Sequence, residues 1–385
     1  MSNRLLVFNC STDMALASGL DNYTPPPMIQ CMERELELLP VWWADDGDVV
    51  LVTDIDEAVL FLDEVNARLH EAGKPTRNIC FADWKGRLTR KAVCWNELRP
   101  VPWGWNKTLA RRFMRLGLNA KHIPSSESLD AMRMLSSRRL AVDYAHHLQT
   151  GFKSGGMNGC VQVSNVRLLG EAMVFVTSMQ LLVETAQSLL PVGPIIFKAP
   201  WSSSGKGNYV VREMDESVLR WAKAVIMKQG GLCVDRFYNK RLDFAMEFSL
   251  SGDGSCAFLG YSLFNTDSLG RYEGNVVTSQ ERILESIISS GADPMVLERL
   301  VSYHQRHLPL CLGRDYRGIV GVDMLLAEQD GMVCLHPCIE INLRMNMGVV
   351  ALALARQGVS DCFLTPPDNP HFRARVFQGR FFIEK

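Results

Sequence analysis

The stretch of sequence that best indicates the fold reads PIIFKAPWSSSGKGNYVV, from Pro194 to Val211. Its apolar ends predict two β-strands, and the first strand ends near Lys198. The residues between them are small and offer many backbone N–H donors, so the loop can approach phosphate oxygens closely. We therefore expect a β-hairpin with a phosphate-binding tip, in which Lys198 supplies a charge from a rigid strand.

This hairpin is not a P-loop. A P-loop has the order Gly, four residues, Gly-Lys-Ser/Thr, and it lies between a strand and a helix. Here Pro200 takes the place of the first glycine, Gly207 follows Lys206, and a strand comes next. Taken alone, the segment is equally consistent with an exposed hairpin turn that contains a lysine by chance.

A candidate metal site lies further along the chain. Residues 318–326 predict a buried strand that contains a single acid, Asp323, and a turn separates it from a second predicted strand over residues 332–342. Alternation places Glu340 and Asn342 on one face of that second strand. A hairpin of this length brings Asp323 beside both residues, and two carboxylates with one amide oxygen are ligands that Mg²⁺ prefers. The alternative is a buried Asp323 held in a salt bridge.

Cys334, His336 and Cys338 share the strand face of Glu340, which raises the question of a zinc site. Residues two apart on an extended strand lie about 6.6–6.8 Å from each other, too far to converge on one ion without ligands from elsewhere. We therefore interpret these residues as two core thiols and one hydrogen-bonded histidine.

The composition is that of a globular protein, since 47% of the 385 residues are hydrophobic and 22% are charged. Lys and Arg number 41 against 42 Asp and Glu, which argues against a nucleic-acid-binding surface. No apolar run has the length of a membrane span, the first residues lack the pattern of a signal peptide, and eleven cysteines have no framework spacing. We expect a cytoplasmic protein that binds neither nucleic acid nor membrane, and the composition indicates no oligomeric state.

Alternating predicted strands and helices suggest a Rossmann-like parallel sheet over roughly the first 115 residues. We predict one helix from Leu129 to about His147, preceded by serines suited to its N-cap, and a second helix over residues 173–190. Residues 264–275 predict a long polar loop that could contact a substrate or be an ordinary surface loop.

In their order and spacing these motifs resemble the ATP-grasp superfamily, which includes D-alanine–D-alanine ligase, glutathione synthetase and the biotin carboxylases. The resemblance covers roughly residues 120–355, and the chain is also similar to an uncharacterised bacterial group of ATP-grasp proteins. It implies an α+β fold, the ATP-grasp fold, in which two α+β subdomains clasp ATP, preceded by a Rossmann-like α/β domain. The implied domains are residues 1–120 (Rossmann-like), 121–230 (N-terminal subdomain with the lid hairpin) and 231–385 (C-terminal subdomain with the metal site).

The resemblance also implies roles for single residues. The nucleotide would be bound by four features: a lysine on a strand, one of two upstream arginines, the lid, and a hinge segment that contacts adenine and ribose. The residues concerned are Arg138 or Arg139, Lys198, Ser202, Ser203, Ser204, Gly205, Lys206, Gly207, Asp235, Phe237 and Asp243. Glu247 is the alternative to Asp243 as the ribose acid. Asp323, Glu340 and Asn342 would hold one or two Mg²⁺ ions, or Mn²⁺, and Lys198 and Arg344 would act in catalysis.

The implied activity is an ADP-forming ligase reaction. A carboxylate oxygen attacks the γ-phosphorus of ATP, and an amine, or less often a thiol, then displaces phosphate from the acyl phosphate. The expected partners are a small-molecule or peptide-like carboxylate and an amine co-substrate. The alternatives are a kinase or other phosphotransferase on the same scaffold, and a nucleotide-binding module without catalysis. The products separate the first two, because a phosphorylated hydroxyl persists whereas an acyl phosphate goes on to a condensed product.

Overall fold

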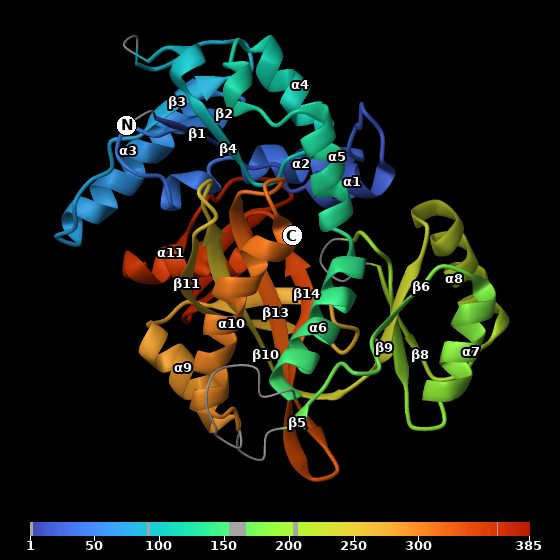
Figure 1. Ribbon diagram of the computed structural model, residues 1–385. Coiled ribbons are helices and arrows are strands. Elements are labelled where there is room, and N and C mark those ends of the chain that lie inside the picture. Colours follow the sequence, from blue (N-terminus) through green and yellow to red (C-terminus); the bar gives the residue numbers. More distant parts are fainter. Residues whose placement is uncertain (1–2, 91–92, 154–166, 203–206, 360) are drawn as a thin grey trace. The chain divides into compact units, whose positions relative to one another are not determined.

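The structure is a computed structural model, which describes residues 3–90, 93–153, 167–202, 207–359 and 361–385 (Figure 1). The chain divides into two compact units: unit 1 comprises residues 1–131 and 344–385, and unit 2 comprises residues 132–343. Residues 344–385 are thus grouped with unit 1, whereas the sequence predicts one C-terminal subdomain over residues 231–385, which stays a prediction. The expected boundary near residue 230 falls inside unit 2 and stays a prediction.

Unit 1 contains a sheet of four parallel strands in the order β3-β2-β1-β4, as the Rossmann-like prediction requires. Its strands are short and apolar, and they share a buried core with helix α4 that includes Leu5, Leu51 and Phe113. Helix α3 begins after Asp54, whose carboxylate accepts hydrogen bonds from the N–H groups of Asp56 and Glu57. The elements of the first part of the chain are β1 (Arg4–Val7), α1 (Thr12–Ser18), α2 (Pro27–Glu35), η1 (Leu39–Trp42), β2 (Val49–Val52), α3 (Ile55–Glu71), β3 (Cys80–Asp83), η2 (Trp95–Glu97), β4 (Arg99–Pro102), α4 (Lys107–Arg115), η3 (Ala120–His122) and α5 (Ser126–Leu135).

The C-terminal segment of unit 1 adds one helix and three short strands. Strands β15, β16 and β17 pair in an antiparallel meander. Trp42 ties this segment to the N-terminal part of the unit, because its indole N–H donates to the Leu364 carbonyl at 2.7 Å. The elements are α11 (Met347–Arg356), β15 (Cys362–Phe363), β16 (Arg373–Phe377) and β17 (Arg380–Glu384).

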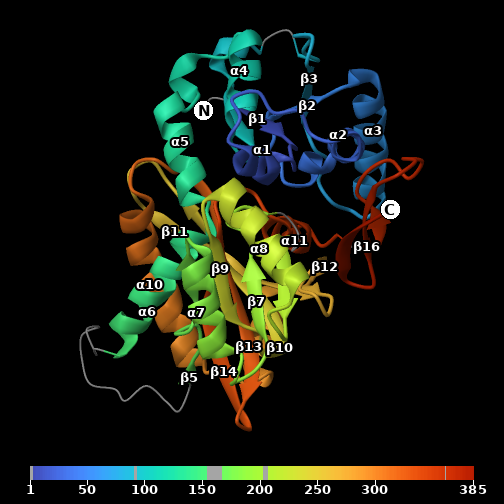
Figure 2. The same ribbon diagram turned by 90° about the vertical axis from the view of Figure 1, so that its right-hand side faces the viewer.

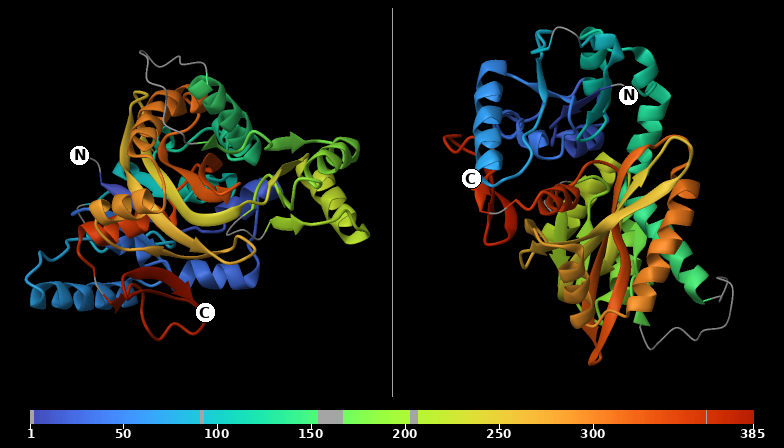
Figure 3. Two further views of the ribbon diagram at one scale, coloured as in Figure 1. Left: turned by 90° about the horizontal axis from the view of Figure 1, so that it is seen from below. Right: turned by 90° about the vertical axis from the view of Figure 1, so that its left-hand side faces the viewer.

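Unit 2 is built around long strands in the order β12-β11-β10-β13-β14-β5. All neighbours among them pair antiparallel except β14 and β5, which run parallel. Helix α6 packs on β14, and helices α9 and α10 pack on β11. Figure 3 shows the orange strands β13 and β14 side by side along their length. The elements are α6 (Arg138–Lys153), β5 (Arg167–Leu168), β10 (Asn239–Leu250), β11 (Cys256–Thr266), β12 (Tyr272–Val276), α9 (Gln280–Ser289), α10 (Pro294–Leu312), β13 (Gly318–Gln329) and β14 (Met332–Asn342).

A second, smaller sheet of unit 2 has the order β6-β9-β7-β8, and all its pairs are antiparallel. Helices α7 and α8 pack against it, as Figure 2 shows, and bury an apolar core that includes Leu182, Phe197 and Ala222. The predicted hairpin is present, because β7 and β8 pair from Ile195–Val211 to Lys198–Asn208. The elements are β6 (Val174–Val176), α7 (Met179–Leu189), β7 (Ile195–Lys198), β8 (Asn208–Val211), α8 (Glu216–Gln229) and β9 (Leu232–Arg236).

Three expectations about single elements are wrong. The helix predicted over residues 129–147 is two helices, α5 and α6, because the Arg138 N–H donates to the Pro200 carbonyl instead of continuing the α5 ladder. The helix predicted over residues 173–190 begins only at Met179, since the β-branched and aromatic residues 174–176 pair with β9 as a strand. The loop predicted over residues 264–275 is a hairpin of β11 and β12.

That hairpin turns at Asp267, whose carboxylate accepts hydrogen bonds from the N–H groups of Leu269 and Arg271, both at 2.8 Å. A short local turn of this kind replaces a long loop, because the aspartate side chain satisfies the backbone at the bend.

Among the helices of the described residues, none is both long enough and apolar enough to cross a membrane.

Candidate functional site

The β-hairpin that is predicted to carry the candidate metal ligands is present. Asp323 on β13 lies directly opposite Glu340 on β14, and Gly321 lies opposite Asn342. Side chains of directly opposed residues share one face of a sheet, so the three candidate ligands lie together. Asn342 Nδ2 donates to Asp323 Oδ2 at 3.0 Å. The amide oxygen of Asn342 is therefore directed away from that hydrogen bond, and the side chain is held by the acid next to it.

Arg138 joins this hairpin to the phosphate loop. It is the first residue of α6 and is only 5% exposed. One guanidinium nitrogen, Nη2, lies 2.8 Å from Glu340 Oε2. The other, Nη1, donates to the Ala199 carbonyl at 2.5 Å and to Ser202 Oγ at 2.7 Å. One buried guanidinium thus contacts a candidate metal ligand and the base of the lid.

Arg139 is in a different environment. Its side chain is exposed, and it forms an ion pair with Asp143 on the same helix, with Nε 3.9 Å from Oδ2. Its guanidinium lies 5.7 Å from the ring centroid of Phe175. Of the two arginines that the sequence left open, the structure places Arg138 beside Glu340 and Arg139 at the surface. The sequence carries no signal for this choice, because it depends on where helix α6 begins.

Lys198 is the last residue of β7, with an exposed fraction of 7%. It lies opposite Cys233 on β9 and Asn208 on β8. Burial raises the pKa of the Cys233 thiol to about 12 even though the positive charge of Lys198 acts in the opposite direction. The thiol beside Lys198 is therefore neutral, and the lysine side chain is buried at the start of the lid.

The lid is described only at its two ends. Ser203, Ser204, Gly205 and Lys206 lie outside the described residues. At the ends, the Ala199 N–H donates to the Gly207 carbonyl at 2.9 Å. A Cβ atom on Gly207 would lie 2.5 Å from the Cβ atom of Ser202, closer than packed side chains allow. A glycine is therefore required at this position by the packing of the hairpin base.

The acid expected at the adenine has internal partners. Asp235 is 1% exposed, its Oδ2 lies 3.2 Å from Nε2 of the buried His336, and its Oδ1 accepts the Arg236 N–H at 2.8 Å. Burial by itself would raise the pKa of Asp235, but the hydrogen bond and charge of His336 and the charge of Lys198 lower it overall. His336 is thus the hydrogen-bonded core histidine that the sequence predicts, and its partner is Asp235. A contact of Asp235 with adenine stays a prediction.

The remaining hinge and ribose candidates also have partners. The Phe237 N–H donates to the Pro194 carbonyl at 2.9 Å, so this donor is already used. Asp243 is 8% exposed and accepts hydrogen bonds at Oδ2 from Lys240 Nζ and Thr266 Oγ1, both at 2.7 Å. Lys240 fits no spacing of the family motif, and the structure explains it as the ion-pair partner of Asp243.

Glu247 belongs to the same surface as the metal candidates. It lies on β10 opposite Gly321, which in turn lies opposite Asn342. Its carboxylate is 1% exposed and accepts a hydrogen bond from Ser262 Oγ at 2.9 Å. The sequence offered Glu247 only as an alternative ribose acid. Its position beside the candidate metal ligands became visible only through the pairing of strands β10, β13 and β14.

Arg344, a candidate catalytic residue, belongs to unit 1. Its Nε lies 2.9 Å from both carboxylate oxygens of Asp13. Both side chains are largely buried, with exposed fractions of 17% and 16%. Within unit 1 this arginine is therefore held by an acid of helix α1, and a catalytic role stays a prediction.

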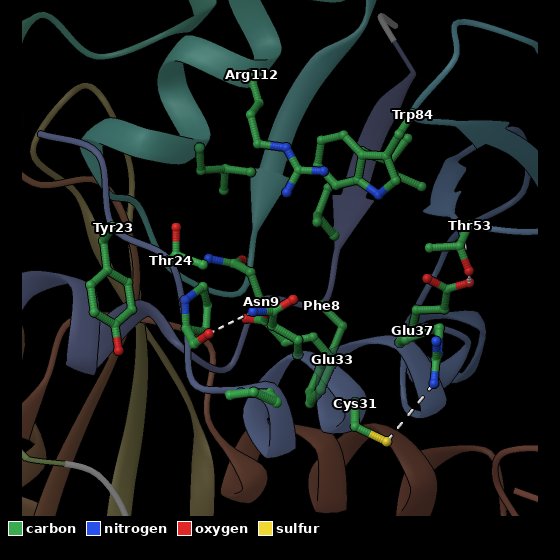
Figure 4. Close-up of a pocket in the computed structure, with 17 residues that line it drawn as sticks. Phe8, Asn9, Tyr23, Thr24, Cys31, Glu33, Glu37, Thr53, Trp84 and Arg112 are labelled. Carbon is green, nitrogen blue, oxygen red and sulfur yellow. Dashed lines mark hydrogen bonds between the residues drawn. The ribbon is translucent and has the colours of Figure 1, made fainter.

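Unit 1 contains a cavity of about 560 Å³ at the carboxyl ends of its parallel strands (Figure 4). The guanidinium carbon of Arg112 lies 3.4 Å from the centroid of the Trp84 ring on one wall. Glu37 lies on another wall, and its Oε1 accepts hydrogen bonds from the N–H and hydroxyl of Thr53 at 2.6 and 2.7 Å. Burial raises the pKa of Glu37 to about 7. No motif signalled this cavity, although the ends of parallel strands are where α/β sheets commonly bind ligands.

Several solved structures are similar to this chain. N5-carboxyaminoimidazole synthetase from Staphylococcus aureus, complexed with ADP, is 11% identical, with 92% of this chain and 78% of that chain covered and a TM-score of 0.41. D-alanyl-alanine synthetase A from Vibrio cholerae is 12% identical, with 93% and 95% covered and a TM-score of 0.41. Biotin carboxylase from Campylobacter jejuni is 13% identical, with 93% and 71% covered and a TM-score of 0.41. No protein-family model and no curated protein matches the sequence.

The sheet topology can be compared with the fold that the sequence predicts. A four-stranded sheet carries the Gly/Ser-rich hairpin, with Lys198 at the end of β7. A larger, mainly antiparallel sheet carries the acidic hairpin, in which Asp323 faces Glu340. A parallel Rossmann-like sheet precedes both along the chain. These parts and their order are the ones that the resemblance to the ATP-grasp superfamily implies for the chain.

Proposed function

We propose that this protein is an Mg²⁺-ATP-dependent ligase that activates a substrate carboxylate as an acyl phosphate. An amine, or a thiol, then attacks the acyl carbon, and the reaction releases ADP and phosphate. The observation that carries the proposal is the buried Arg138, which contacts both Glu340 and Ser202. Arg138 thus connects the candidate metal ligands to the phosphate loop. Phosphoryl transfer depends on holding the metal ion and the phosphates in a fixed arrangement, and such a connection favours it.

The side chains present fit a magnesium ion. Asp323 and Glu340 offer carboxylates from directly opposed positions, and Asn342 lies beside them with its amide anchored on Asp323. This set contains only oxygen donors on rigid strands, which suits a hard cation that retains water and phosphate oxygens in its shell. When bound, the ion would neutralise charge on the phosphates of ATP.

The other residues would act on the nucleotide and its reaction. Lys198 would place a fixed positive charge against the phosphates, since it is buried at the end of a strand. Arg138 would turn from Glu340 toward a phosphate group, two oxygens of which its planar guanidinium can bind in bidentate fashion. The lid between Ser202 and Gly207 would exclude water from the acyl phosphate, which water would otherwise hydrolyse.

The first experiment is a thermal-shift titration of the full chain with ATP, with and without Mg²⁺. At a ligand concentration about 100-fold above its Kd, binding stabilises the native state by about 2.7 kcal/mol. We expect an Mg²⁺-dependent rise in melting temperature in the wild type and its loss in Glu340→Gln. Glu328→Gln is the matched control, because Glu328 is an exposed acid on the same hairpin, opposite Val333.

A wild type that shows no shift at millimolar ATP would refute the nucleotide site. If ATP binds, candidate acids and amines are screened for release of ADP together with a condensed product. A stable phosphorylated alcohol instead of a condensed product would show a phosphotransferase.

A further inference from the structure

Three side chains of unit 1 bring a sulfur, a nitrogen and an oxygen atom to one point. Cys31 and Glu35 lie one turn apart on helix α2, and His371 comes from the segment before β16. Cys31 Sγ lies 3.2 Å from Glu35 Oε1 and 3.3 Å from His371 Nδ1. The third side, from His371 Nδ1 to Glu35 Oε1, is 3.2 Å. The three atoms form a nearly equilateral triangle.

This arrangement differs from a cysteine–histidine–acid relay. In a relay, one ring nitrogen contacts the nucleophile and the other contacts the acid. Here the same nitrogen, Nδ1 of His371, faces both Cys31 and Glu35. The cluster therefore converges on a point and does not pass a proton along a chain.

The size of the triangle suits a metal ion. A point at equal distance from its three corners lies about 1.9 Å from each atom, against about 2.0–2.3 Å for bonds from zinc to oxygen, nitrogen and sulfur. An ion slightly above the plane of the three atoms would reach all of them at bonding distance. Thiolate, imidazole and carboxylate are the ligand types that zinc uses.

The surroundings orient the ligands for that role. Glu35 is 7% exposed, and its other oxygen, Oε2, accepts the Phe372 N–H at 2.8 Å and the His371 N–H at 3.2 Å. These backbone donors fix the carboxylate so that Oε1 faces Cys31 and His371, as an outer hydrogen bond does for a metal ligand. The His371 side chain is 53% exposed, so solvent reaches the cluster from one side.

We propose that Cys31, Glu35 and His371 bind a divalent transition-metal ion of the zinc class, with a further coordination position open to water. Three protein ligands with an open position are typical of zinc sites that take part in chemistry or in ligand binding. Cys31 also lines the cavity of unit 1 (Figure 4), so the ion would lie at the wall of that cavity. This site is independent of the proposed nucleotide site, whose candidate metal ligands are all in unit 2.

The test uses Co²⁺ as a spectroscopic substitute for zinc in the full chain after treatment with a chelator. We expect saturable binding of one ion that gives a thiolate-to-cobalt charge-transfer band in the near ultraviolet, a band that the oxygen ligands of the candidate magnesium site cannot give. Zn²⁺ should displace the cobalt and abolish the band. Absence of saturable binding in the wild type would overturn the proposal.

Single variants locate the site. Cys31→Ser should lose the charge-transfer band, and His371→Ala should lower the metal affinity at least about tenfold. His371→Ala is informative even if changes at the buried Glu35 impair folding, because His371 is half exposed. The matched controls are Cys94→Ser and His70→Ala, which remove an exposed cysteine and an exposed histidine of unit 1 outside the cluster. Unchanged affinity in His371→Ala, or an unchanged band in Cys31→Ser, would refute the assignment.

Discussion

Nη2 of Arg138 lies 2.8 Å from Oε2 of Glu340, 202 residues further along the chain. The side chain of Arg138 is 4% exposed and that of Glu340 is 26% exposed, so water screens the arginine poorly but reaches the acid. Within unit 2, this pair connects the start of α6 to the acidic hairpin. A buried charge is costly unless it is paired, which gives Arg138 a structural role as well as its proposed contact with phosphate.

A comparison of the two adjacent arginines tests that role. Arg138→Ala should lower the free energy of unfolding by about 1–3 kcal/mol, because Glu340 and the Ala199 carbonyl lose a charged donor. Arg139→Ala should change it by less than about 0.5 kcal/mol, since its ion pair is exposed. Urea denaturation at pH 7 measures both values. Equal effects of the two substitutions would contradict the placement of Arg138.

The lowered pKa of Asp235 predicts that the stability of the protein depends on pH. Its folded-state pKa is lowered, so it contributes stability above its unfolded-state pKa of about 4, and this contribution is lost as the pH falls through the lower folded-state value. Asp235→Asn should therefore be less stable than the wild type by about 3 kcal/mol at pH 7, and the difference should shrink below about pH 4.

Denaturation curves of wild type and Asp235→Asn at several pH values provide the measurement. Asp63→Asn, which changes an exposed acid of helix α3, serves as the control and should show no such trend. A difference between wild type and Asp235→Asn that stays constant down to pH 3 would speak against a charged, partnered Asp235.

The raised pKa of Glu37 predicts the opposite dependence of stability on pH. Burial raises its folded-state pKa to about 7 from 4.5, so the folded state favours the protonated acid. The stability that this group contributes is complete below about pH 4.5 and is lost as the pH rises through about 7. Relative to Glu37→Gln, which mimics the protonated form, the wild type should lose at most about 3 kcal/mol between these pH values.

The check is urea denaturation of wild type and Glu37→Gln at pH 5 and pH 7.5. The hydrogen bonds from Thr53 persist in the glutamine variant, because its amide oxygen accepts as the carboxyl oxygen does. A stability difference that does not depend on pH would show that Glu37 ionises at an ordinary value.

Alanine substitutions at two glycines distinguish the cost of backbone strain from the cost of a steric clash. Gly170 and Gly230 both have positive φ, +92° and +79°. A Cβ atom on Gly170 would lie 2.7 Å from Nε2 of His336, the atom that contacts Asp235, whereas a Cβ atom on Gly230 would meet nothing within 4 Å. Gly230→Ala should cost about 1 kcal/mol for strain alone, and Gly170→Ala should cost about 1–3 kcal/mol more. Thermal denaturation of both variants compares them, and equal costs would contradict the packing of His336 against Gly170.

Patterns of period two were the most informative part of the sequence. The alternation that places Glu340 and Asn342 on one face also fixed the hairpin with Asp323, because a register slip by one residue would move all three side chains to the other face. The apolar runs on either side of the Gly/Ser-rich segment likewise predicted the β7–β8 hairpin, whose strands pair as expected.

Contacts between distant segments were beyond the reach of the sequence. The start of α6 depends on a hydrogen bond from Arg138 to Pro200, the partner of Asp235 is His336, and the cluster of Cys31 and Glu35 is completed by His371. Each is a contact of two segments that lie far apart along the chain, which no periodicity encodes. The sequence by itself thus determined the strands, the hairpins and the types of side chain that they carry. Only the tertiary structure decided which charged groups are buried together, because the cost of an unpaired buried charge depends on every segment that packs around it.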